Sequence, residues 1–203
     1  MSFELIDNLL QVAALGSTAL AAAAASVRRR DRRCLILALA YACFAMGTLF
    51  YVLHLAIVGT VPKVFYVSEV SWLAAYLFYL SLQILRTEPI AVRFSWLPAL
   101  GALLAAVTVL VVRIMGPSYL VSALFALTVS AIVYLSAFRL LHAPQRSRLD
   151  ACMLLCVTLQ VLLYLVSVFM SDYTRFNLYF AVDLALTASL IALLPLTLRE
   201  VPA

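Results

Sequence analysis

The chain has 203 residues, of which 67% are hydrophobic and 11% are charged, and its formal net charge is +5. Because soluble domains carry about 25% charged residues, this composition excludes a soluble enzyme and predicts an integral membrane protein. A transmembrane helix needs about 20 apolar residues, so the length accommodates seven helices with short loops and no separate soluble domain. The apolar runs are continuous rather than alternating, which favours an all-α fold over a β-barrel.

Seven apolar runs predict seven transmembrane helices in one domain that covers residues 1–203. In chain order the runs cover residues 9–27, 34–58, 64–85, 94–112, 119–138, 151–170 and 177–198. A signal sequence carries its positive charges before its apolar core, whereas Glu4 and Asp7 precede the first run and arginines follow it. We therefore expect the first run to be a retained helix.

The basic residues predict the orientation of the bundle, because Lys and Arg near the ends of spans favour the cytoplasmic side. With the N-terminus outside and the C-terminus inside, all 14 lysines and arginines except Lys63, Arg113 and Arg175 fall on the cytoplasmic side. The positive charge is thus a topology signal that also attracts anionic lipid headgroups of the bilayer, and it is not evidence for nucleic-acid binding.

A weak internal repeat relates two parts of the chain, residues 49–86 and 162–199. Superposing them needs no gap and aligns the following pairs: Tyr51 with Tyr164, Tyr66 with Tyr179, and Arg86 with Arg199. A further shift of one position brings Glu69 beside Asp183. Either an ancestral duplication or chance matching between two apolar segments explains these pairs.

A duplication predicts a specific architecture. Two parallel three-helix repeats, at about residues 9–86 and 119–199, flank a linking helix at 94–112. Repeats of this kind occur in some transporters, with the substrate site between the halves. Receptors share the same helix count and sidedness, so the architecture alone does not decide the function.

The polar residues exclude several kinds of chemistry. Only His54 and His142 are histidines, which excludes a bis-histidine haem site within the bilayer and argues against a His-rich zinc site. The sole lysine, Lys63, lies in a predicted outer turn, which argues against a retinal Schiff base. No phosphate-binding loop, HExxH or GxSxG motif occurs, so we expect neither an enzyme nor a cofactor or metal site.

Two carboxylates within predicted spans, Glu69 and Asp183, are the strongest candidates for a functional site, because a charge inside the membrane is costly. Spacings of three or four residues place several aromatic and polar side chains on the same face of the third helix as Glu69, and Thr187 shares a face with Asp183. The candidate ligand-binding residues are Glu69, Asp183, Trp72, Tyr76, Tyr79, Gln83, His54 and Thr187. Apolar walls with a few polar anchors are typical of small-molecule sites.

Structural roles compete with this interpretation. Both carboxylates lie one or two turns below the predicted outer surface, where they can reach interfacial water or pair with Lys63 or Arg175. Aromatic residues near the helix ends fit an interfacial belt, and His54 fits a hydrogen-bonded packing residue as well as a proton carrier.

The run SEVSWLAAYLFYLSLQILR, at residues 68–86, places an aromatic residue three positions after an acidic one and a tyrosine four positions later. A fainter copy is AVDLALTASLIALLPLTLR, at residues 181–199. This pattern resembles the seven-transmembrane sensory regions that precede bacterial diguanylate cyclases and sensor histidine kinases. The resemblance implies a bundle that detects a ligand or a membrane state and passes the signal to a cytoplasmic output domain. Since the sequence ends at Ala203, we expect signalling through a separate partner or through an output domain beyond this sequence.

Three functions therefore stay open. The first is a sensor or receptor-like bundle in a bacterial plasma membrane, which binds a small or lipophilic ligand near its outer side and signals to a cytoplasmic protein, as a monomer or a homo-oligomer. The second is a small transporter with its site between the two repeats. The third is an anchor subunit whose basic inner loops dock a soluble enzyme.

Overall fold

The computed structural model describes residues 3–59, 66–88, 93–113, 119–143, 147–170 and 172–200, and the regular structure of these residues is entirely α-helical. The helices are α1 (Phe3–Arg29), α2 (Arg32–Val58), α3 (Tyr66–Thr87), α4 (Trp96–Arg113), α5 (Tyr119–His142), α6 (Arg148–Phe169) and α7 (Leu178–Glu200). Six of them are long and apolar enough to cross a membrane, and the apolar part of α4, Trp96–Val112, is shorter. The predicted all-α, multi-pass membrane class is thus confirmed.

One predicted helix boundary is wrong in a way that matters. α1 begins at Phe3 rather than at residue 9, so Glu4 and Asp7 lie inside the helix and do not precede it. Acidic residues are favourable in the first turns of a helix, where free backbone amides and the helix dipole attract negative charge. Asp7 is also 4% exposed, so it belongs to the interior of the bundle.

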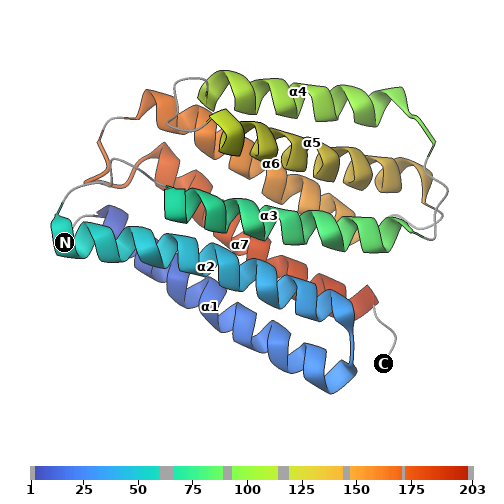
Figure 1. Ribbon diagram of the computed structural model, residues 1–203, viewed down its shortest axis with the longest axis horizontal. Coiled ribbons are helices and arrows are strands. Elements are labelled where there is room, and N and C mark those ends of the chain that lie inside the picture. Colours follow the sequence, from blue (N-terminus) through green and yellow to red (C-terminus); the bar gives the residue numbers. More distant parts are fainter. Residues whose placement is uncertain are drawn as a thin grey trace.

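Six helices form a closed ring in the order α1, α2, α3, α5, α6 and α7, in which each helix contacts the next and α7 contacts α1. α4 lies outside this ring against α5 and α6, along one edge of the bundle (Figure 1). α1–α3 and α5–α7 thus form two consecutive halves of the ring, and the duplication that would explain this order stays a prediction.

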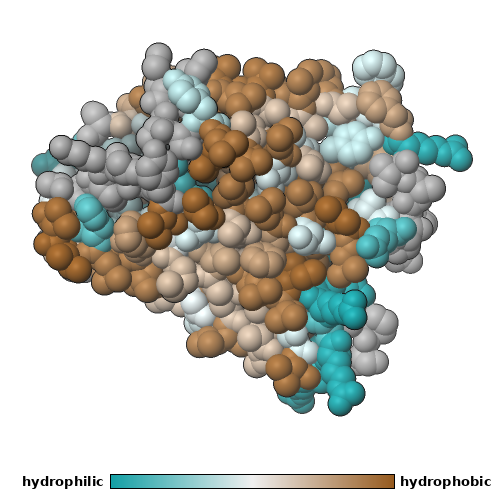
Figure 2. Space-filling model, viewed as in Figure 1, coloured by the Kyte–Doolittle hydropathy of each residue, from teal (hydrophilic) through white to brown (hydrophobic). Residues whose placement is uncertain are grey.

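The outer surface of the ring and of α4 is apolar, as a lipid environment requires. Leu20 and Leu104, for example, expose 75% and 68% of their surface. Figure 2 shows apolar side chains over the middle of the molecule and hydrophilic ones gathered at one end, around the turn between α1 and α2. We call this the basic end, because five arginines, at positions 28, 29, 30, 32 and 33, lie in this turn or next to it. The opposite end, where α1, α3 and α7 begin, is called the acidic end.

Aromatic side chains fill the centre of the ring. Tyr41, Tyr76, Tyr79 and Phe125 form an aromatic layer, with ring centroids 5.0–6.2 Å apart in the contacting pairs. The Tyr41 hydroxyl donates to the Leu190 carbonyl at 2.8 Å, and the Tyr76 hydroxyl donates to Gln160 Oε1 at 2.8 Å. Since lipid gives no hydrophobic drive for helix association, such packing and hydrogen bonds hold the helices together.

At the basic end a buried ion network joins α3, α5, α6 and α7. The Arg86 guanidinium contacts Asp150 at 2.5 Å and Glu200 at 2.9 Å, and Arg139 Nε lies 3.1 Å from Asp150 Oδ2. The side chains of Arg86 and Asp150 are 3% and 0% exposed. Ser147, the N-cap of α6, accepts from Arg86 Nη2 at 2.9 Å and donates to Glu200. This network fixes the ends of four helices relative to one another.

Gly47 allows α2 and α3 to approach closely, and the Ser68 hydroxyl donates to its carbonyl at 2.9 Å. We expect Gly47→Ala to lower the melting temperature of the detergent-solubilised protein, because the new Cβ would lie 2.9 Å from Trp72 Nε1 and 3.0 Å from the Ser68 carbonyl oxygen. Overpacking of this kind costs about 1–3 kcal/mol. Gly16→Ala is the matched control, since a Cβ there meets nothing within 4 Å. An unchanged melting temperature for Gly47→Ala would contradict the tight contact.

Asp150→Asn is expected to destabilise the protein by about 3–5 kcal/mol, because it leaves two arginines without their shared buried carboxylate. Denaturant unfolding in mixed micelles would measure the loss. Arg33→Gln is the control, because its pair with Asp31 is longer, at 3.6 Å, and the Arg33 side chain is 33% exposed, so removing it should cost less than about 1 kcal/mol. Equal losses in both variants would show that burial of the network contributes nothing.

Candidate ligand-binding cavity

A cavity of about 490 Å³ opens at the acidic end of the ring. α1, α2, α3, α4, α6, α7 and the α6–α7 connection all contribute to its wall. Its lining residues are Glu4, Asn8, Gln11, Phe44, Tyr51, Glu69, Trp72, Val112, Gln160, Leu163, Tyr164, Ser167, Val168, Tyr173, Tyr179 and Asp183. A volume of this size suits a small organic molecule.

The two carboxylates singled out from the sequence both line this cavity. Glu69 lies in the first turn of α3 and Asp183 in the second turn of α7, and they are only 5% and 6% exposed. Both are turned away from lipid toward the interior of the ring. Their places near helix N-termini are electrostatically favourable, since the helix dipole stabilises negative charge there.

Gln11 of α1 is the centre of the hydrogen-bond network beneath the cavity. Its Nε2 donates to Asp183 Oδ1 at 3.1 Å and to Thr187 Oγ1 at 3.0 Å, and its Oε1 accepts from the Thr48 hydroxyl at 2.9 Å. Thr48 in turn accepts from Trp72 Nε1 at 3.3 Å. One amide thus joins α1, α2 and α7, and through Thr48 it also positions the indole of α3.

The carboxyl group of Asp7 on α1 lies beside that of Asp183 on α7. Two neighbouring carboxylates repel each other, so the pair disfavours carrying two negative charges at once. Asp7 Oδ2 is buried and has no hydrogen-bond partner among the described residues.

The α6–α7 connection covers the start of α1 at the mouth of the cavity. The amide of Phe3 donates to the Thr174 carbonyl at 3.2 Å, and the hydroxyl of Tyr51 donates to Glu4. Burial raises the pKa of the Tyr173 hydroxyl, and the negative charge of Glu4 raises it further. Tyr173 therefore stays protonated as a neutral hydrogen-bonding group of the wall.

The described residues of the cavity wall carry charge of one sign. Three carboxylates, Glu4, Glu69 and Asp183, line it, and the described lining residues include no lysine, arginine or histidine. Six of the 13 other described lining residues are aromatic, among them Phe44 and Trp72, which pack at a centroid distance of 6.4 Å. Carboxylates and aromatic faces both attract cations, so the site is complementary to a positively charged group.

The structure brings only part of the predicted residue set to the cavity. Glu69, Trp72 and Asp183 line it, and Thr187 lies just below as an acceptor of Gln11. Tyr76 and Tyr79 belong to the aromatic layer instead. Gln83 accepts from Arg86 at the basic end, 3.1 Å away, and His54 is half-buried beside Phe50, outside the described lining. The predicted partner Lys63 and the side chain of Arg113 lie outside the described residues.

The sequence interpretation missed the contribution of α1. Glu4, Asp7, Asn8 and Gln11 recur at spacings of three or four residues, which places them on one face of a helix. A polar stripe on an otherwise apolar span is the signal that identifies an inward face. It was overlooked because the first two acidic residues were assigned to the flank of the helix.

No protein-family model matches the chain, and no curated protein and no solved structure shows significant similarity to it.

Gln11→Leu is expected to destabilise the protein by about 2 kcal/mol, because it removes three interhelical hydrogen bonds of about 0.6 kcal/mol each. The melting temperature in detergent would report the loss. Ser17→Ala on the same helix is the control, since the Ser17 hydroxyl bonds only within α1, to the Ala14 carbonyl at 2.9 Å. A Gln11→Leu variant as stable as Ser17→Ala would refute the central role of this amide.

Proposed function

We propose that the protein is a seven-helix membrane sensor that binds a small organic cation in the cavity at its acidic end and signals to a cytoplasmic partner. The observation that carries this proposal concerns Asp183 of α7, which is buried, lines an aromatic-walled cavity together with Glu69 of α3, and has no basic side chain among its described neighbours. The resemblance of residues 68–86 to bacterial sensory membrane regions supports the sensory class.

The chemistry of the ligand follows from the cost of buried charge. A buried carboxylate is stabilised by a partner that supplies a positive charge and hydrogen bonds. For Asp183 the described wall supplies a neutral donor, the Gln11 amide, and no cation. An ammonium group bound at Asp183, in the cavity that Glu69 also lines, would supply the charge, and the indole of Trp72 would offer it a cation–π face.

The side from which the ligand enters follows from the positive-inside rule. The arginines of the α1–α2 turn, together with Arg86 and Arg139, favour the cytoplasmic side for the basic end. The cavity then opens toward the outside of the cell. We accordingly assign the protein to a plasma membrane, with an extracellular ligand and an intracellular partner.

Two helices reach from the cavity to the opposite side of the membrane. α3 carries Glu69 at the cavity and Arg86 in the ion network, about 25 Å apart along the helix. α7 carries Asp183 at the cavity and Glu200 in the same network. A cation that draws the two carboxylates together would shift both helices, and the cytoplasmic partner would sense the shift at the network.

Binding is tested with a matched pair of ligands, 2-phenylethylamine and 2-phenylethanol, which differ chiefly in charge. Trp96 is 79% exposed, and replacing it with phenylalanine leaves Trp72 as the sole tryptophan of the protein. The amine should then change Trp72 fluorescence saturably, and the alcohol should not. Glu69→Gln or Asp183→Asn should weaken amine binding about tenfold or more, because each removes one of the two carboxylates that would attract the ammonium group.

Asp172→Asn is the matched control, because this carboxylate lies at the same end, is exposed and does not line the cavity. Equal binding of amine and alcohol, or equal losses in all three variants, would contradict the proposed cation site. Proteoliposomes separate sensing from transport: a sensor binds the amine without carrying it. Carboxylate-dependent uptake would favour the transporter alternative, for which the Asp7–Asp183 pair offers a proton-carrying group.

A further inference from the structure

A second cavity, of about 450 Å³, lies at the basic end and plays no part in the proposed cation site. Five arginines line it, at positions 30, 32, 33, 86 and 139. They come from the α1–α2 turn with the start of α2, from the end of α3 and from the end of α5, so three separate stretches of the chain place positive charge around one space. Asp31 and Glu200 are the acidic residues of the described lining.

The carboxylates here do not balance the arginines. Arg86 and Arg139 share Asp150, and Arg86 also contacts Glu200, so these charges serve the buried network. Arg33 lies 3.6 Å from Asp31. Even with Asp150 counted, five guanidinium groups face three carboxylates, and the cavity is positively charged.

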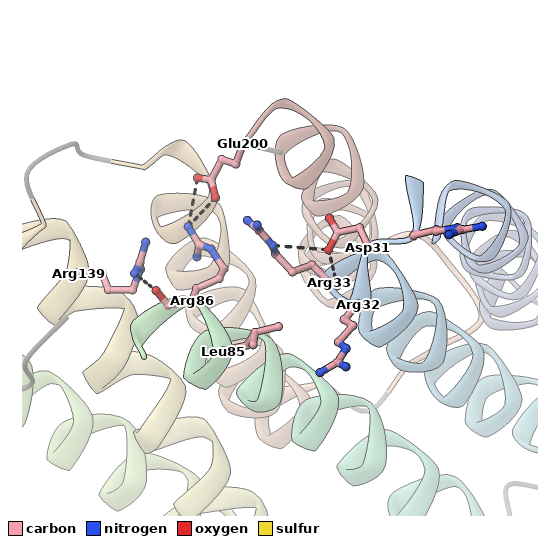
Figure 3. A pocket seen from close by; sticks show the side chains of 8 residues that line it. Asp31, Arg32, Arg33, Leu85, Arg86, Arg139 and Glu200 are labelled. Carbon is pink, nitrogen blue, oxygen red and sulfur yellow. Dashed lines mark hydrogen bonds and ion pairs between the residues drawn. The ribbon is translucent and has the colours of Figure 1, made fainter. Parts of the chain in front are cut away.

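The turn between α1 and α2 is short, so its arginines lie close together. α1 ends at Arg29 and α2 begins at Arg32, and Arg30 adopts a left-handed conformation, with φ 52°. The Asp31 side chain accepts from the Arg33 amide at 2.9 Å and caps α2, so its charge is partly used by the helix. Figure 3 shows Arg33 reaching toward Arg86 and Glu200, while Arg32 points toward α3.

We propose that this cavity binds a phosphate group, with Arg30, Arg32 and Arg33 as its ligands. Arginine is suited to phosphate because its planar guanidinium donates two parallel hydrogen bonds to two phosphate oxygens. Basic pockets between helices at the cytoplasmic surface of a membrane are suited to lipid headgroups. Arg86 and Arg139 form the floor of the site and add positive charge without leaving their own partners.

An anionic phospholipid is the source of phosphate that the surroundings favour. Val27, Leu35 and Ile84 expose 81%, 48% and 49% of their surface near the ends of the helices that form the cavity. These residues offer an apolar path for acyl chains next to the arginines. A soluble phosphate compound would use the same guanidinium groups without this path.

The test uses dioctanoyl phosphatidic acid, dioctanoylglycerol and inorganic phosphate, titrated into the full chain in a neutral maltoside detergent and followed by calorimetry. Phosphatidic acid should bind saturably, and the glycerolipid without phosphate should not. Arg30→Gln/Arg32→Gln should weaken phosphatidic acid binding about tenfold or more, because charge-assisted hydrogen bonds are lost. Both residues are exposed and stand outside the buried network, so the variant should fold.

Arg28→Gln/Arg148→Gln is the matched control, since it removes the same charge from the same end, and neither residue lines the cavity. Its affinity for phosphatidic acid should stay within about twofold of the unaltered protein. Equal losses in the two double variants would show a general surface attraction and overturn the site, as would binding of dioctanoylglycerol equal to that of phosphatidic acid. Inorganic phosphate that binds as tightly as the lipid would identify a soluble phosphate compound as the source, whereas much weaker binding would identify the lipid.

Discussion

The cost of a carboxylate in the membrane interior is the constraint on which this structure depends. Desolvation penalises an ionised group unless charges or hydrogen bonds compensate for it. The protein meets this cost in two different ways. At the basic end Asp150 is fully buried between Arg86 and Arg139. At the acidic end Asp183 accepts from the neutral Gln11 amide and lies beside a second carboxyl group, Asp7. Asp150 therefore has counter-charges, whereas the described neighbours of Asp183 supply none.

This difference distinguishes the two carboxylates better than burial does. Asp150 and Asp183 are almost equally buried, at 0% and 6% exposure, so burial alone does not distinguish them. What differs is the neighbourhood: Asp150 lies between two guanidinium groups, whereas Asp183 itself lines an aromatic-walled cavity. A group that has its counter-charge stabilises the fold. Asp183, whose described neighbours supply no counter-charge, lies beside an open space that a ligand with such a charge would suit.

The sequence predicted the fold class and part of the cavity, and the reasons for both are physical. Continuous apolar runs allow only helices in lipid, and the cost of charge identified Glu69 and Asp183. Periodicity then misassigned Gln83, because residues that share a helix face need not share a site. Gln83 lies about 21 Å along α3 from Glu69, at a rise of 1.5 Å per residue, and it meets Arg86 instead.

The contribution of α1 to the cavity was missed because Asp7 was assigned to the flank of the first helix. In the structure α1 begins at Phe3, so Asp7 lies within the helix. The pairing of Arg86 with Asp150 was not foreseen either, since 64 positions separate the two residues and no local pattern relates them.

Under the proposed function, a bound cation would join helices at the acidic end as Arg86 joins them at the basic end. In the buried network a guanidinium lies between carboxylates of α6 and α7 and fixes those helices to α3. An ammonium group between Glu69 and Asp183 would join α3 to α7 through ion pairs of the same kind, and these would break when the ligand dissociates. The two helices that would be drawn together at one end are therefore the two that an ion pair already holds at the other. Because a helix is rigid along its axis, a change of their separation at the cavity is opposed at the network, so the strain of ligand binding would concentrate on the contacts of Arg86 and Glu200. That is the place where a cytoplasmic partner would find the signal.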